Sequence, residues 1–78
     1  MKDKPTNIRH QLFTQLYDRY CGRVYNYVMM ISHGNAYLAV EVTQTTFLKV
    51  WENLDMLSDY EHLRTYMLHT ARNIFLNL

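Results

Sequence analysis

Residues that break helices are nearly absent from this chain, which has one proline and two glycines among its 78 residues. Pro5 lies close to the N-terminus, and Gly22 and Gly34 both lie in the first half of the chain. Because proline and glycine are the residues that a helix interior tolerates least, their scarcity leaves room for long helices. β-branched residues are scattered and no hairpin turn signal is present, so the alternative of a β-sheet is weak.

The N-terminal part of the chain carries an apolar stripe at helical spacing. Its members are Ile8, Leu12, Leu16, Tyr20, Val24, Val28 and Ile31, and it is widened by Phe13, Tyr17 and Tyr27. Start and stop signals at Pro5 and Gly34 predict that this segment is one helix of about 27 residues. Gly22 falls inside it, so we expect a local bend or a close helix contact at that residue.

Two further helices are predicted downstream. Asn35 is suited to cap the second, which runs from Ala36 to about Asn53. Its inward face is expected to contain Leu38 or Ala39, Val42, Phe47, Val50, Trp51 and Leu54. Ser58 and Glu61 form a capping box for the third helix. The apolar stripe of this helix consists of Leu63, Tyr66, Met67, Thr70, Ala71, Ile74, Phe75 and Leu78.

Three helices with short connections predict an all-α fold, a compact bundle of three main helices in which the first is long and neighbours are antiparallel. Residues 1–78 form one domain in this interpretation, because the chain is too short for two independent cores. No cap, glycine or proline ends the third helix, so we expect the natural protein to be longer.

The composition favours an intracellular protein. No stretch is apolar enough to predict a membrane span, and the N-terminal residues lack the apolar core of a signal peptide. Cys21 is the single cysteine, so an internal disulfide is impossible, and we interpret it as a small core residue rather than a reactive thiol. A cytoplasmic location is the plain expectation.

Charge is distributed unevenly although the net charge is only +1. Basic residues predominate in residues 1–40 and after residue 61, whereas the segment 41–61 has five acidic residues against Lys49. This pattern is typical of two surfaces that meet two different partners, and chance variation in a small domain explains it equally well.

No catalytic constellation is visible. The four histidines, His10, His33, His62 and His69, do not fall at the spacing of zinc ligands beside a cysteine or a carboxylate pair. His62 and His69 are two turns apart and share a helix face, for which ordinary surface histidines are the simpler interpretation. We therefore expect neither an enzyme nor a bound cofactor.

The second predicted helix has an unusual outer face. Glu41, Gln44, Thr45 and Leu48 share one side at spacings of three and four residues, whereas Phe47, Val50 and Trp51 look elsewhere. Acid and amide groups beside one exposed leucine suit docking on a positively charged helix. An ordinary solvated face is the alternative that the spacing alone leaves open.

Three segments in order resemble a known family. They are the aromatic stripe from Phe13 to Tyr27, the segment Ala39 to Glu52, and Tyr66-Met67-Leu68-His69-Thr70-Ala71-Arg72-Asn73. Together they are similar to the first conserved domain, region 2, of bacterial sigma factors, and most of all to the extracytoplasmic-function class. The resemblance covers about residues 10–78. For the outer face of the second predicted helix, it favours docking on a partner over the alternative of an ordinary solvated face.

The resemblance implies two binding surfaces and no catalysis. One surface, Glu41, Gln44, Thr45 and Leu48, corresponds to the face that binds the clamp coiled coil in the largest subunit of core RNA polymerase. The other corresponds to the pocket and track that recognise and melt the promoter minus-ten element by capturing flipped bases of the single-stranded non-template strand. Its expected members are Leu57, Ser58, Tyr60, His62, Arg64, Leu68, His69, Arg72 and Asn73.

Three departures from the family pattern concern side-chain chemistry. Val40 stands where the family usually has an acid, Tyr66 where it usually has tryptophan, and Thr70 where it usually has isoleucine. The C-terminal helix-turn-helix domain of such factors is absent from this chain, and whether an anti-sigma factor binds it is open. The alternative function is a helical protein-protein adaptor or dimerisation module without a nucleic-acid role.

Overall fold

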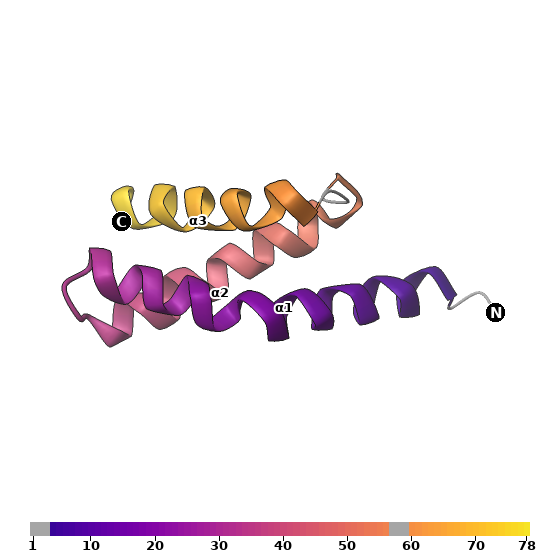
Figure 1. Ribbon diagram of the computed structural model, residues 1–78, viewed down its shortest axis with the longest axis horizontal. Coiled ribbons are helices and arrows are strands. Elements are labelled where there is room, and N and C mark those ends of the chain that lie inside the picture. The colour runs from indigo at the N-terminus through magenta and orange to yellow at the C-terminus, as the bar shows by residue number, and fades with distance from the viewer. Residues whose placement is uncertain (1–3, 57–59) are drawn as a thin grey trace.

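The computed structural model describes the backbone of residues 4–56 and 60–78 and the side chains of residues 8–55 and 62–78. It contains three helices, α1 at Lys4–Ile31, α2 at Ala36–Glu52 and α3 at Tyr60–Leu76, with a 3-10 turn at Leu54–Met56 (Figure 1). The described residues include no strand. The predicted all-α bundle with a long first helix is therefore confirmed, and none of the described helices is long and apolar enough to cross a membrane.

Helix α2 occupies the centre of the arrangement. The chain runs along α1, returns through α2 and reverses again into α3, so α2 is antiparallel to both of its neighbours (Figure 1). All three pairs of helices are in contact, and α2 packs against each of the others. The molecule measures 47 × 23 × 21 Å, and α1 accounts for most of its length. Consequently one side of α2 is enclosed by two helices and its other side is left to form a surface.

The turn between α1 and α2 shows how local sequence directs the chain. Gly34 N–H donates to the Met29 carbonyl at 2.7 Å and His33 N–H donates to the Met30 carbonyl at 3.3 Å, which is the bond pattern of a Schellman motif. His33 has φ 57° and therefore holds the left-handed position, and Gly34 follows with φ 86°. The side chain of Asn35 then accepts from Leu38 N–H at 3.0 Å, which confirms Asn35 as the cap of α2.

The core joins the predicted stripes of all three helices. Its members are Leu16, Tyr20, Val24, Val28, Ala39, Val42, Phe47, Val50, Leu54, Leu63, Met67 and Ala71. Ile8 was expected in the first stripe but is 62% exposed, because the first turns of α1 extend past the turn that follows α2 (Figure 1). Leu78 is also exposed. Apart from the backbone of α1 itself, no described atom lies within 4 Å of a Cβ placed on Gly22. Of the two expectations for Gly22, a local bend or a close helix contact, the close contact is therefore wrong.

Two buried threonines in α2 were not expected from its apolar pattern. Thr46 is fully buried, and its hydroxyl donates to the Val42 carbonyl at 2.7 Å. Thr43 is 5% exposed, and its hydroxyl has no hydrogen-bond partner among the described residues. A buried hydroxyl without a partner costs its desolvation free energy. Thr43 is therefore a local weakness in an otherwise apolar centre.

We predict that Thr43→Val raises the free energy of unfolding by about 1 kcal/mol, because it replaces an unsatisfied hydroxyl with a methyl group of similar size. Thr46→Val is the matched control in the same helix, and no gain is expected from it because its hydroxyl is already bonded. Thermal denaturation followed by circular dichroism measures both. Equal effects of the two substitutions would contradict the assignment.

Candidate functional site

A hollow of about 430 Å³ opens between α1 and α2. It is lined by Phe13, Tyr17, Gln44, Phe47, Leu48 and Trp51. Five of these six side chains are apolar or aromatic, and Gln44 is the one that carries an amide. An apolar hollow with one amide at its edge suits a side chain of another protein better than a small charged substrate.

Edge-to-face aromatic contacts build the floor of the hollow. Phe47 of α2 lies 4.9 Å from Tyr17 and 6.2 Å from Phe13, ring centroid to ring centroid, with interplanar angles of 63° and 83°. Phe13 also meets Trp51 at 5.4 Å and 88°. Such pairs are worth about 0.5–1.5 kcal/mol each beyond the area they bury. The walls of the hollow are therefore held at a fixed separation before any partner arrives.

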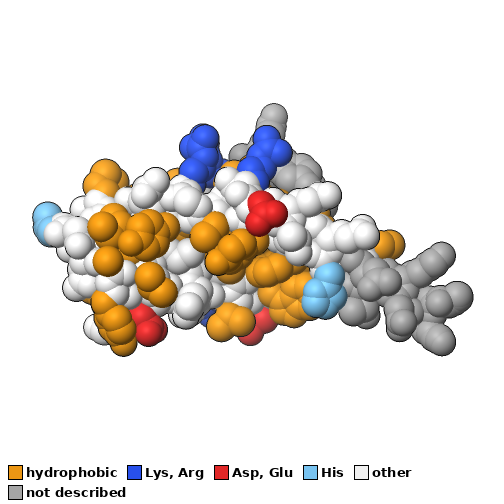
Figure 2. Space-filling model, turned by 90° about the horizontal axis from the view of Figure 1, so that it is seen from below, with side chains coloured by type: hydrophobic (Ala, Val, Ile, Leu, Met, Phe, Trp, Pro, Cys, Tyr) orange, Lys and Arg blue, Asp and Glu red, His pale blue; other side chains and the backbone are white. Residues whose placement is uncertain are grey.

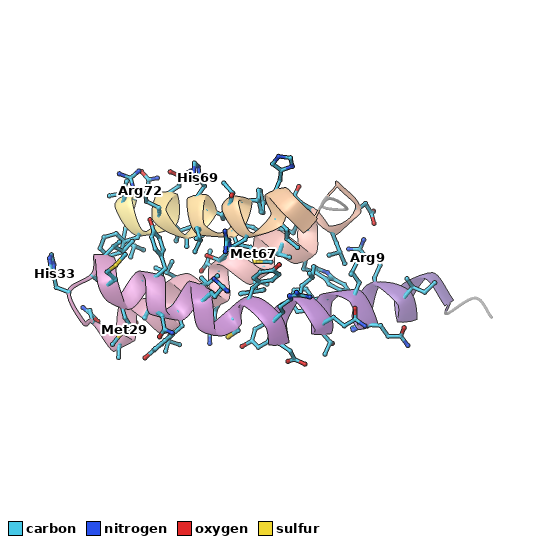
Figure 3. All side chains as sticks on the ribbon, viewed as in Figure 1. Arg9, Met29, His33, Met67, His69 and Arg72 are labelled. Carbon is cyan, nitrogen blue, oxygen red and sulfur yellow. The ribbon has the colours of Figure 1, made fainter. Side chains whose placement is uncertain are left out.

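Arg9 closes one end of this cluster. Its guanidinium lies 4.7 Å from the centre of the Trp51 ring and donates both to the Trp51 carbonyl at 3.0 Å and to Asp55 at 2.7 Å. The His10 ring lies 5.2 Å from the same indole. Figure 3 shows Arg9 reaching from α1 toward the turn that follows α2. These contacts fix the end of α2 against the N-terminal half of α1.

Tyr17 lines the opposite part of the hollow. A side-chain hydrogen bond with Cys21, followed by an electrostatic interaction with the same residue, desolvation by burial and the charge of Asp18, raises the pKa of Tyr17 above its ordinary value. The phenol therefore stays neutral at any physiological pH and offers the hollow an uncharged aromatic ring. Cys21 itself is half-buried beside the core.

The outer side of α2 carries the residues that the sequence singled out for docking. Glu41, Gln44 and Leu48 are exposed, and Leu48 keeps 62% of its surface in solvent. Thr45 is half-buried at the edge of this side. Phe47 and Trp51 were expected to look elsewhere, but both line the hollow together with Gln44 and Leu48. That expectation is wrong because α1 packs beside Trp51, so that the indole forms one wall of the hollow.

Sequence reasoning also missed the contribution of α1 to this surface. Phe13 and Tyr17 were interpreted as a widening of the core stripe, although Tyr17 is 40% exposed. The signal was their spacing of four residues on one edge of that stripe, which places both rings on the same side of α1. Only the position of α2 shows that this side faces a hollow.

Helix α3 presents a second surface. His62, Arg64, His69, Arg72 and Asn73 are exposed, and Leu68 is half-buried. Figure 3 shows His69 and Arg72 on the side of α3 that points away from α1, whereas Met67 points toward the interior. Helical geometry places His62, His69 and Asn73 in one row, with Arg64 roughly half a turn away from Asn73.

The expected DNA-binding set is described only in part. Leu57 and Ser58 lie outside the described residues, as does the side chain of Tyr60. Arg64 and Arg72 form no ion pair with any acidic side chain that the structure describes. Both guanidinium groups therefore remain available to a negatively charged partner. No group of three or more potential metal ligands is present among the described residues.

The fold and its two surfaces define a small helical binding domain. The family model Sigma-70 region 2 matches residues 16–78, and the chain belongs to this family. The family is one of transcription initiation factors rather than enzymes, and its members bind RNA polymerase and the −10 element of promoters. Searches of curated proteins and of solved structures gave no match.

We predict unequal effects for the two partners in the Arg9–Asp55 pair. Arg9→Ala lowers the free energy of unfolding by about 1 kcal/mol because it uncovers Trp51 as well as breaking the ion pair. Asp55 is 87% exposed, so Asp55→Asn costs less than about 0.5 kcal/mol, and this cost disappears in high salt. Urea denaturation at low and high salt measures the free energy of unfolding of both variants. Equal losses in the two variants would contradict the stabilising contact between Arg9 and the Trp51 indole.

Proposed function

We propose that this domain docks on core RNA polymerase through the hollow and the outer side of α2, while α3 and the turn before it recognise and open the promoter −10 element. The observation that carries the proposal is the hollow itself, an apolar recess whose rim is formed by Gln44 and the exposed Leu48. Both residues belong to the face that resembles the polymerase-binding face of sigma factors. The partner in this proposal is the clamp coiled coil of the largest polymerase subunit.

The chemistry of α2 supports docking on a basic helix. The aromatic floor accepts an apolar side chain, and burial of such an anchor in a preformed recess is what makes a few interface residues dominate affinity. Glu41 adds a negative charge on the same side, which favours a lysine or arginine of the partner. Thr45 and the Gln44 amide provide hydrogen bonds at the rim.

The chemistry of α3 supports contact with an unpaired DNA strand. Arg64 and Arg72 attract phosphates without reading sequence. His69 offers a ring for stacking and Asn73 an amide for a base edge, and each stacked base contributes about 1–3 kcal/mol. An extruded base would be received near Ser58 and His62, where short polar groups suit its pairing edge. Binding of single-stranded DNA then shifts the duplex toward the open state without any covalent step.

The modest net charge fits a factor that acts only on the polymerase. A protein that binds DNA by itself through many phosphate contacts needs a larger excess of positive charge than +1. Polymerase binding would supply most of the affinity, and α3 would supply the selectivity for the open strand. We assign the chain to the extracytoplasmic-function class and place its action in the cytoplasm, where an anti-sigma factor is a further candidate partner.

We predict that Gln44→Ala and Leu48→Ala each weaken binding to purified core RNA polymerase by about tenfold, because each removes a rim group of the recess. Gln15→Ala and Leu76→Ala are matched controls, since Gln15 is exposed on α1 and Leu76 is 60% exposed on α3. Fluorescence titration of the labelled domain measures the four affinities. The docking face is wrong if the controls lose as much affinity as the rim variants.

We predict that Asn73→Ala reduces open-complex formation about fivefold or more while leaving polymerase affinity unchanged, because it removes a group that meets the unpaired strand. Permanganate reactivity of unpaired thymines on a cognate promoter measures opening, and co-purification with core polymerase measures docking. Asn26→Ala, an exposed asparagine on α1, is the control. Parallel loss of opening and docking would make Asn73 a structural residue.

A further inference from the structure

A hydrogen bond between side chains joins the C-terminal end of α2 to the second turn of α3. The amide nitrogen of Asn53, the residue that caps α2, donates to the Tyr66 hydroxyl at 3.3 Å and to the Lys49 carbonyl at 2.9 Å. Because the Lys49 carbonyl can only accept, this second bond determines which end of the amide is its nitrogen. Asn53 and Tyr66 are both half-buried, and neither lines the hollow.

This bond depends on the kind of aromatic residue at position 66. A tyrosine hydroxyl can accept the second N–H of the Asn53 amide, whereas the indole of tryptophan has an N–H donor and no acceptor. Tyr66 stands where the family usually has tryptophan, so the bond is possible in this chain because of that departure. The two residues therefore form a pair in which each needs the other.

Tyr66 lies in the middle of the row that α3 is proposed to present to DNA. It follows His62 by four residues and precedes His69 by three and Asn73 by seven, so all four share one line along the helix. The three other members of this row are exposed. Figure 2 views the molecule from the side of α1 and shows hydrophobic side chains spread across it, whereas the row on α3 is polar on both sides of Tyr66. A bond at Tyr66 consequently acts at the centre of the row.

Apolar packing alone constrains the rotation of α3 about its axis only loosely. The buried residues of this helix are Leu63, Met67 and Ala71. Methionine adapts to the space around it and alanine has a small side chain, so this ridge tolerates small rotations. A rotation of about 20° moves a group at the helix surface, 5–6 Å from the axis, by about 2 Å. Such a displacement exceeds the ~0.5 Å within which binding groups must be held.

We propose that Asn53 and Tyr66 are positioning residues that hold α3 at the rotation in which its row meets the unpaired promoter strand. The inference rests on the proposed function, because it concerns how the DNA-facing surface of α3 is held. A hydrogen bond fixes direction as well as distance, and the Asn53 amide is itself held by the Lys49 carbonyl at the end of α2. The pair acts through His69 and Asn73, whose places relative to α2 it sets.

The test uses the domain bound to core RNA polymerase and compares Tyr66→Phe, Asn53→Ala and the double variant. Tyr66→Phe keeps the ring and removes the acceptor, so we expect open-complex formation to fall about threefold to fivefold while polymerase affinity stays unchanged. The double variant is expected to lose no more than Asn53→Ala alone, because both substitutions break the same bond. Tyr66→Trp is expected to lose as much as Tyr66→Phe, since an indole cannot accept. Permanganate reactivity on a cognate promoter measures opening.

Tyr25→Phe is the matched control for removal of a tyrosine hydroxyl. Tyr25 is a half-buried residue of α1, and its hydroxyl forms no hydrogen bond with the residues that the structure describes. We expect this substitution to change neither opening nor polymerase affinity. Circular dichroism melting of each variant establishes that it is folded.

Several results overturn the proposal. If Asn73→Ala impairs opening but Tyr66→Phe does not, the pair has no positioning role and the DNA-facing surface of α3 stands. If neither impairs opening, the assignment of α3 to DNA is itself wrong. Equal losses of polymerase binding and opening in Tyr66→Phe would make the bond purely structural. Full opening by Tyr66→Trp, or additive losses in the double variant, would show that the hydrogen bond is not what matters.

Discussion

The packing of Phe47 against Phe13 and Tyr17 is the contact on which the rest of the structure depends. It joins the middle of α2 to α1 through rings that meet edge to face, and it fixes the separation of the two helices. On one side of these rings the core continues to α3, and on the other side the hollow opens. The same aromatic group therefore stabilises the fold and forms the floor of the hollow. A partner that enters the recess meets a surface already ordered by folding.

The position of α2 between two neighbours also separates the charges of the molecule. Its inner side packs into the core, and its two acidic residues, Glu41 and Glu52, are exposed on its outer side. The exposed side of α3 faces another direction and carries arginine and histidine. Two surfaces of different chemistry on one small bundle suit the proposed division between a protein partner and a DNA strand. Neither surface needs catalytic chemistry.

Some features of the molecule favour binding at the expense of stability. A domain of this size has little apolar surface to bury, yet Leu48, Tyr37 and Val40 remain in solvent. Thr43 has a buried hydroxyl for which the described residues offer no hydrogen-bond partner. Exposed apolar side chains that line up along one face of a helix are typical of an interaction surface rather than of chance packing. The contacts of Arg9 with Trp51 and Asp55 hold the C-terminal end of α2 against α1.

The sequence alone determined the helices, their limits and most of the core, because spacing, caps and breakers act over a few residues. Asn35 and the stripes of Leu16, Val24 and Val28 are examples. The family and the outer face of Glu41 and Gln44 were also visible in the sequence. Only the tertiary structure decided that Trp51 and Tyr17 line a hollow and that Ile8 stays in solvent. Whether an aromatic residue at the edge of a stripe is buried or exposed depends on where the neighbouring helix lies. A local sequence pattern gives no information on the distance between two helices.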